Sequence, residues 1–246
     1  MASDAPPEPN DACPRCGKSP ALCVCRGVTP VDNRVFVLIL QHPQEQDAAL
    51  GTARLAALHF RNALFKIGLS WPSLSKALGR SVDPQRWAVL HLGSVRAAAL
   101  APGREIVVLD RKGHALADQE SALGEIEGIV LLDGSWSQAK ALWWRNAWML
   151  KCRRIVLAPR RPSRYGRLRR EPRPDSLATI EAAALLLSRL EDRPEIEAAL
   201  TQSFAALLDR YRALPRETAA PANREPTARR GIRGDRNRRR RPRSFG

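Results

Sequence analysis

The sequence lacks the features that would assign it at once to a membrane, to secretion or to a common nucleotide-binding fold. No apolar run approaches the ~20 residues that a transmembrane helix needs. The opening stretch, MASDAPPEPNDACPRC, has neither the basic segment nor the apolar core of a signal peptide, so we expect a cytoplasmic protein with no membrane partner. Neither a GxGxxG after the first apolar run nor a P-loop occurs, so those standard phosphate-binding motifs are missing.

Acidic residues are also scarce relative to basic ones. The chain has 246 residues, with 41 Lys and Arg against 25 Asp and Glu, a net charge of +16. Half of this charge lies in residues 216–246, which contain 11 Arg and 3 acids. A basic body followed by a basic tail indicates a polyanionic partner, and we expect RNA. An arginine-rich tail that serves solubility alone is the alternative. No obligate protein partner is indicated.

Strand-like and helix-like patterns alternate along the middle of the chain. Continuous apolar strands separated by helices predict an α/β fold with a mostly parallel sheet that helices cover on both faces. Residues 1–12 and 215–246 lack periodicity, and we expect them to be disordered. Strands are predicted over 34–42, 87–93, 104–110, 127–134 and 153–159, and helices over 47–65, 135–149, 175–191 and 194–214.

Four of the five cysteines lie within thirteen residues, at Cys13, Cys16, Cys23 and Cys25. Two close pairs of thiolates can supply all four ligands of one Zn²⁺, which leaves no open coordination position and indicates a structural site. A reducing cytoplasm argues against disulfides. We therefore predict a zinc-binding module over residues 13–27, with unliganded thiols as the alternative. The fifth, Cys152, is expected to be a small buried side chain.

Polar side chains follow two of the predicted strands. The first strand runs into QHPQE, which contains His42 and Glu45, and the fourth runs into Asp133, Ser135 and Trp136. Ligands of open parallel sheets bind at the carboxyl edge of the strands, and an acid beside an aromatic wall suits a nucleobase or an adenosyl group. The alternatives are structural: His42 capping the strand end, and Ser135 serving as a helix N-cap.

A long basic loop follows the last predicted strand. Residues 160–174, RRPSRYGRLRREPRP, contain seven Arg, one Tyr and three Pro. Arginine beside an aromatic ring suits phosphate contact and base stacking, whereas a solvated loop is the alternative. The predicted RNA contacts are Arg160, Arg161, Arg164, Tyr165, Arg167 and Arg170.

Several of these motifs occur in the order found in one known family. DTW-domain proteins carry the same motifs in the same order. These are the Cys module, LQHPQE, GTARLAAL followed by Arg61-Asn62-Ala63, LLDGSWSQAK and SLATIEA. That family is named for an Asp-x-Thr-Trp-type motif. Here the motif reads Asp133-Gly134-Ser135-Trp136, and serine keeps the hydroxyl. The resemblance extends from about Cys13 to Tyr211, so residues 28–214 resemble a DTW catalytic domain.

The resemblance implies a tRNA-uridine aminocarboxypropyltransferase. Such enzymes move the 3-amino-3-carboxypropyl group of S-adenosylmethionine to N3 of a tRNA uridine and release methylthioadenosine. In bacterial members the product is acp3U in the variable loop. The resemblance also implies a SPOUT-like fold whose knotted chain end holds the cofactor. A SPOUT-like RNA methyltransferase and a non-catalytic, zinc-containing RNA-binding protein are the alternatives.

The resemblance further implies roles for residues at matching positions. Asp133, Ser135 and Trp136 fall on the signature and are candidate catalytic residues. Tyr165 and Arg169 match a Tyr-x-Leu-Arg-like pattern, with one extra residue in the spacing here. The candidate contacts to S-adenosylmethionine are Leu131, Leu132, Asp133, Trp136, His42, Pro43, Glu45, Arg169, Thr179 and Glu181.

Transfer to uridine N3 requires a proton acceptor, because the N3 proton must leave. Asp133 is the first candidate, either as the base or as the group that orients N3–H, and Glu45 and Glu181 follow. A carboxylate of ordinary pKa, about 4, is a weak base for this reaction, so burial would have to raise the pKa of the one that serves. Arg169 is expected to hold the carboxylate of the transferred arm.

Overall fold

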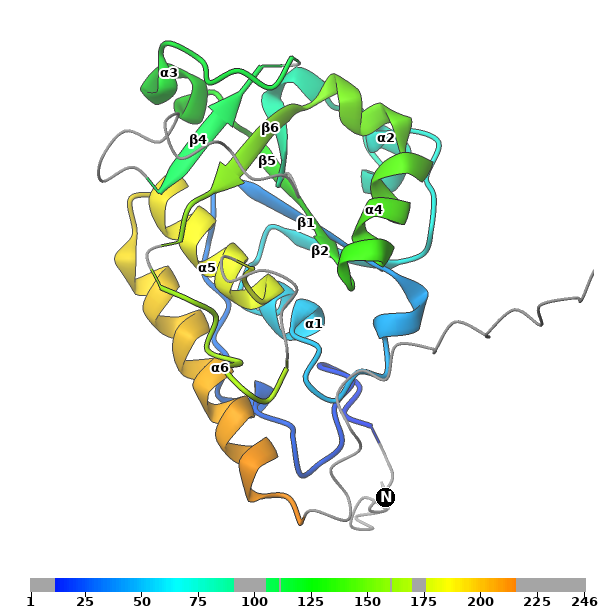
Figure 1. Ribbon diagram of the computed structural model, residues 1–246, viewed down its shortest axis with the longest axis vertical. Helices are drawn as coiled ribbons and strands as arrows, with labels where there is room; N and C mark the ends of the chain where they lie inside the picture. Colours follow the sequence, from blue (N-terminus) through cyan, green and yellow to red (C-terminus); the bar gives the residue numbers. More distant parts are fainter. Residues whose placement is uncertain (1–11, 91–104, 111, 160, 170–175, 216–246) are drawn as a thin grey trace, which may run out of the picture.

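The central feature of the protein is a six-stranded sheet, seen in a computed structural model that describes residues 12–90, 105–110, 112–159, 161–169 and 176–215. The strands lie in the order β2-β1-β5-β3-β6-β4 (Figure 1). All pairs are parallel except that of β4 with β6. The predicted α/β fold with a mostly parallel sheet is confirmed. The strands are β1 (Phe36–Gln41), β2 (Ala63–Ile67), β3 (Trp87–Leu90), β4 (Ile106–Leu109), β5 (Gly128–Asp133) and β6 (Arg153–Leu157).

Helices cover both faces of this sheet, as the apolar strands required. Figure 1 shows α5 and α6 packed side by side on one face, with α2 and α4 on the other. Short 3-10 turns, among them Pro43–Glu45 and Ala147–Lys151, connect the elements. The helices are α1 (Ala53–Ala57), α2 (Leu74–Leu78), α3 (Gln119–Gly124), α4 (Trp136–Arg145), α5 (Thr179–Leu190) and α6 (Pro194–Ala213).

Successive residues of β1 enter two different cores. Val37 and Ile39 pack in the cluster that contains α1, α5 and α6, whereas Leu38 and Leu40 pack against α2 and the turn at Ala147–Lys151. All four side chains are fully buried. A strand buried on both faces needs apolar residues at every position, which explains the continuous run in the sequence.

The helix predicted over residues 47–65 is largely wrong. Only Ala53–Ala57 is helical, and Ala63–Ile67 forms the edge strand β2. Asn33 fixes the residue before β2: its side-chain oxygen accepts from the Asn62 backbone N–H at 3.0 Å, and its amide donates to the Asn62 carbonyl at 3.1 Å. These contacts bridge 29 residues, and β2 then pairs in parallel with β1. Such long-range contacts override the local helical pattern.

Other boundaries differ at the ends of elements. The helix predicted over 135–149 ends at Arg145, because the side chain of Asn146 donates to the Leu142 carbonyl at 2.7 Å and the chain continues as a 3-10 turn. The strand predicted over 87–93 is seen as far as Leu90, since 91–104 lie outside the described residues. Helices α2 and α3 were not predicted, and both are short.

The cysteine segment is built into the body of the protein. Cys16, Leu22 and Cys25 are buried in the same core cluster as α1, α5 and α6. The terminal segments predicted to be disordered, 1–12 and 215–246, lie outside the described residues except for their inner ends. Among the described residues, no helix combines the length and the apolar character needed to cross a bilayer.

Candidate functional site

The carboxyl ends of β1 and β5 lie side by side at the middle of the sheet. The two strands pair in parallel, and Gln41 stands opposite Asp133 at the last position of the register. The His42 N–H then donates to the Asp133 carbonyl at 2.9 Å, so the pairing continues one residue beyond β1. The two motifs that the sequence placed at strand ends therefore meet at one edge of the sheet.

Asp133 is the centre of this edge. Its side chain is 8% exposed, and both carboxylate oxygens accept hydrogen bonds. The Gln41 amide donates to Oδ2 at 2.8 Å, and the Thr179 hydroxyl, at the first residue of α5, donates to Oδ1. A buried carboxylate needs such donors. Since they come from β1 and α5, Asp133 joins the ends of β1 and β5 to the start of α5.

The turn after Asp133 is shaped to begin α4. A Cβ on Gly134 would lie 2.9 Å from the Gln138 Cβ, so no larger residue fits there without movement. Ser135 caps the helix: its hydroxyl accepts from the Gln138 N–H, and the Gln138 side chain accepts from the Ser135 N–H. The N-cap interpretation of Ser135 is thus confirmed. Trp136 follows as the first, half-buried residue of α4.

The end of β1 places a second carboxylate in this region. His42 caps the Pro43–Glu45 turn, because its Nδ1 accepts from the Gln44 N–H at 3.3 Å. Glu45 is only 5% exposed, and this burial raises its pKa above the ordinary range. The Arg169 guanidinium, 3.7 Å from Glu45 Oε2, opposes the shift in the pKa. Glu45 is therefore a buried acid whose neutral form is favoured relative to an exposed glutamate.

The basic loop reaches the site through Arg169. Its guanidinium lies 5.5 Å from the centre of the Tyr165 ring. Tyr165 itself is 2% exposed, packs edge-on against Phe204, and donates its hydroxyl to the Leu50 carbonyl at 2.6 Å. The ring therefore supports Arg169 from within the core. Its expected contact with RNA stays a prediction.

Glu181 fixes the same loop to the start of α5. Its carboxylate accepts from the Ser163 hydroxyl at 2.6 Å, the Arg164 N–H at 2.8 Å and the Ala178 N–H at 2.9 Å. With three donors on one carboxylate, Glu181 has a positioning role in this structure.

The remaining predicted contacts are spread around the site. Leu131 is buried in the core, whereas Leu132 and Pro43 are half-buried. Arg161, Arg164 and Arg167 are exposed. Arg160 and Arg170 lie outside the described residues.

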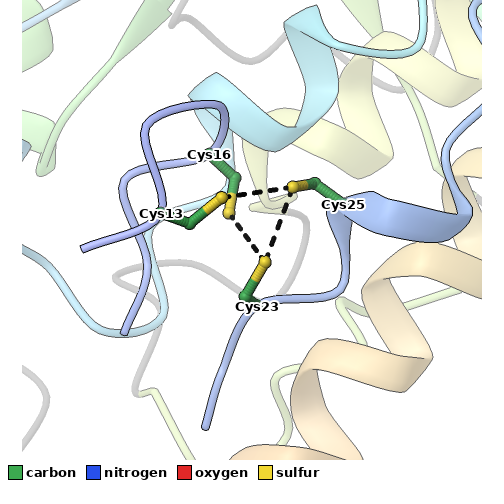
Figure 2. Close-up of side chains that lie close together, drawn as sticks. All are labelled: Cys13, Cys16, Cys23 and Cys25. Carbon is green, nitrogen blue, oxygen red and sulfur yellow. Dashed lines mark hydrogen bonds between the residues drawn. The ribbon is translucent and has the colours of Figure 1, made fainter. Parts of the chain in front are cut away.

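The four clustered cysteines form a compact sulfur cage (Figure 2). Their Sγ atoms all lie within 4.8 Å of one another, and three pairs are 3.5–3.6 Å apart. Tetrahedral zinc with Zn–S bonds of ~2.3 Å would place its sulfurs about 3.8 Å apart, so the four donors fit a structural zinc ion. Cys152 lies elsewhere and is 2% exposed, and burial raises the pKa of its thiol to about 12. It is a buried side chain, as expected.

Sequence reasoning missed two residues of this region. Gln41, the last residue of β1, holds Asp133, and a buried amide at a strand end was the available signal. Lys18, between the cysteine pairs, is 8% exposed and donates to the Ala48 carbonyl at 2.6 Å. Its burial lowers its pKa to about 8, against the opposing charges of Cys16 and Asp133. No local pattern around Lys18 marks it as buried.

Comparison with known proteins gives a consistent result. The sequence model of the DTW domain matches residues 10–212. The chain is similar to proteins named tRNA-uridine aminocarboxypropyltransferase 2 from Drosophila melanogaster (28% identical, covering 82% of this chain and 75% of that protein) and from Macaca fascicularis (26%, covering 79% and 61%). The Mus musculus protein of the same name is 27% identical, with coverage of 79% and 61%. The chain thus spans less than two thirds of the two mammalian relatives. No solved structure matches.

The family match covers every element of the site. It begins before the cysteine cage and ends within α6, and it includes the ends of β1 and β5 and the start of α5. The chain belongs to the DTW-domain family.

Proposed function

We propose that the protein transfers the 3-amino-3-carboxypropyl group of S-adenosylmethionine to N3 of a tRNA uridine, giving acp3U in the variable loop. Three relatives that match about four fifths of the chain carry the name tRNA-uridine aminocarboxypropyltransferase 2. The observation that carries the proposal is the position of the family signature. Asp133 and Trp136 stand at the carboxyl edge of a parallel sheet, beside a second buried acid, Glu45.

The chemical step is a displacement at carbon. Uridine N3 attacks the γ-carbon of the arm, the N3–C bond forms, and the C–S bond breaks. The electron pair of that bond stays on sulfur, which changes from a sulfonium to the neutral thioether of methylthioadenosine. The N3 proton passes to a base. Because methyl and arm are bonded to the same sulfur, the enzyme selects between them only by position.

Glu45 is the stronger candidate for the base. Both oxygens of Asp133 already accept hydrogen bonds, from Gln41 and Thr179, and these bonds hold its carboxylate in the junction of three segments. Glu45 meets the requirement for a pKa raised by burial, and a base works best when its pKa lies near the working pH. We therefore assign proton removal to Glu45. Asp133 holds the strand ends in place, and Trp136 provides an aromatic wall for a base or for the adenosyl group.

Further parts of the proposal rest on the family resemblance and the charge of the chain. We propose a structural zinc ion in the cage of four cysteines, a SPOUT-like arrangement of the sheet, and tRNA binding by the exposed arginines of the basic loop. We place the protein in the cytoplasm.

The experiment is nucleoside mass spectrometry. The purified protein is incubated with S-adenosylmethionine and unmodified tRNA transcript, and the RNA is then digested. A uridine that is heavier by the aminocarboxypropyl group, with release of methylthioadenosine, supports the proposal. A methylated uridine with S-adenosylhomocysteine would replace the proposal with a methyltransferase. RNA binding without binding of S-adenosylmethionine would favour a non-catalytic RNA-binding protein.

A further inference from the structure

Lys18 places a cation inside the protein, where the charges of both Cys16 and Asp133 act on it. Its side chain is 92% buried, yet its Nζ has a single hydrogen-bond partner among the described residues, the Ala48 carbonyl at 2.6 Å. No carboxylate of the described residues forms an ion pair with it within 4.0 Å. An ammonium group has three donors, so two remain for something else.

Such an arrangement indicates a ligand that carries negative charge. Burying an ammonium group costs free energy unless further acceptors or an anion compensate. The segment that bears Lys18 is tied down on both sides, because its backbone carbonyl accepts from the Cys13 N–H at 2.7 Å and its Nζ is held at Ala48. The cation is therefore fixed in position before any ligand arrives.

Charged groups of both signs surround Lys18. Asp133, Arg169 and Arg54 all act on the Lys18 ammonium, as does Cys16 of the cage. Arg169 is already paired with Glu45 at 3.7 Å. The guanidinium of Arg54 lies over the ring of Phe65, 5.3 Å from its centre. Both guanidiniums thus have partners of their own, whereas the Lys18 ammonium has only the Ala48 carbonyl among the described residues.

We propose that Lys18 binds the α-carboxylate of the aminocarboxypropyl arm of S-adenosylmethionine, with Arg169 at the same subsite. This inference rests on the proposed function and adds the subsite that anchors the end of the arm. A fixed carboxylate sets where the γ-carbon lies, so Lys18 contributes to the choice of arm over methyl. The cysteine cage then belongs to the donor site, because it positions Lys18.

The test is ligand binding to the full-length protein by calorimetry. The main variant is Lys18→Met, which keeps the apolar stem and removes the charge. Arg26→Met, an exposed cation of the same segment, is the matched control. The ligands are S-adenosylmethionine, its decarboxylated analogue, and methylthioadenosine, which lacks the arm. Zinc content is measured on each protein.

Lys18→Met is expected to weaken S-adenosylmethionine binding by about 10- to 100-fold, the usual effect of losing one hydrogen bond to a charged group. Binding of the two ligands without the carboxylate should change less than about threefold, and Lys18→Arg should recover part of the loss. Arg26→Met should bind all three ligands as the wild type does.

Three results would overturn the inference. Equal weakening for all three ligands would give Lys18 a structural role. Unchanged ligand binding with loss of zinc would show that the Lys18 ammonium instead balances the negative charge of the metal–thiolate cage. Wild-type protein that binds methylthioadenosine and S-adenosylmethionine equally well would show that no carboxylate subsite exists. If the wild type binds no S-adenosylmethionine, the proposed donor itself is wrong.

Discussion

If Glu45 removes the proton, substitutions of Glu45 and of Asp133 should have different effects on the pH dependence of transfer. In Glu45→Gln the side chain keeps its shape and loses its charge. General-base catalysis contributes typically 10²- to 10⁴-fold, so single-turnover transfer at saturating substrates should fall by about that factor. The rate of the wild type should rise with pH as Glu45 loses its proton, and this rising limb should be missing in the variant. Asp133→Asn should slow transfer and keep the limb, because Glu45 remains.

The stability of Glu45→Gln follows from the same burial. A carboxyl whose folded pKa is raised stabilises the fold fully below its unfolded pKa, and this contribution is lost as the pH rises through the folded pKa. At neutral pH the ionised Glu45 is therefore a cost to the fold. The glutamine variant should have an unchanged or higher melting temperature, so a loss of activity would not reflect unfolding.

The assay is the pH–rate profile of single-turnover acp3U formation between about pH 5 and 9. Asp47→Asn is the control, because it makes the same change of carboxylate to amide at an exposed residue two positions along. A Glu45→Gln enzyme that keeps the rising limb and a rate within about threefold of the wild type would refute the assignment. Loss of the limb in Asp133→Asn alone would transfer the role to Asp133.

Three further predictions concern metal, RNA and the loop. Metal analysis should find one zinc per chain, and Cys16→Ser should lower both the zinc content and the melting temperature, because Cys16 lies in the main core. Truncation after Leu214 should weaken tRNA binding and flatten its dependence on salt, without abolishing turnover at saturating tRNA. An unchanged salt dependence would show that the tail does not contact RNA. Tyr165→Phe should cost about 0.5–1.5 kcal/mol of stability through the lost bond to Leu50, with tRNA affinity retained, whereas weaker tRNA binding at equal stability would give the ring a role in RNA contact.

The parts of the fold that the sequence predicted well are those with a strong local cause. The runs around Leu38 and Val130 are apolar at every position because both faces of the sheet are covered. Helix α6 was predicted almost to the residue, since Pro194 and two acids mark its start and apolar residues recur at helical spacing. The strand β2 was missed because it depends on pairing with β1, more than 20 residues earlier in the chain, and not on a local pattern.

The same limit applies to the site. Spacing along the chain revealed the cysteine cage and the two strand ends, because each is a short motif. Lys18 gave no such signal, since its burial depends on Ala48, 30 residues further on. The roles of the acids could not be predicted either, because they depend on the fold: it brings donors to Glu181 and Asp133, and it buries Glu45 beside Arg169.

These contacts explain why an acid and a tryptophan stand together at the end of β5. Asp133 receives Gln41 from β1 and Thr179 from α5, so it joins three segments that are distant in the sequence. The turn through Gly134 then places Trp136 at the start of α4 beside that junction. If Asp133 mainly holds this junction, Thr179→Val should lower activity in the same way as Asp133→Asn and keep the pH profile. If Asp133 acts on the substrate proton, Thr179→Val should instead shift the profile, because it removes a donor from that carboxylate.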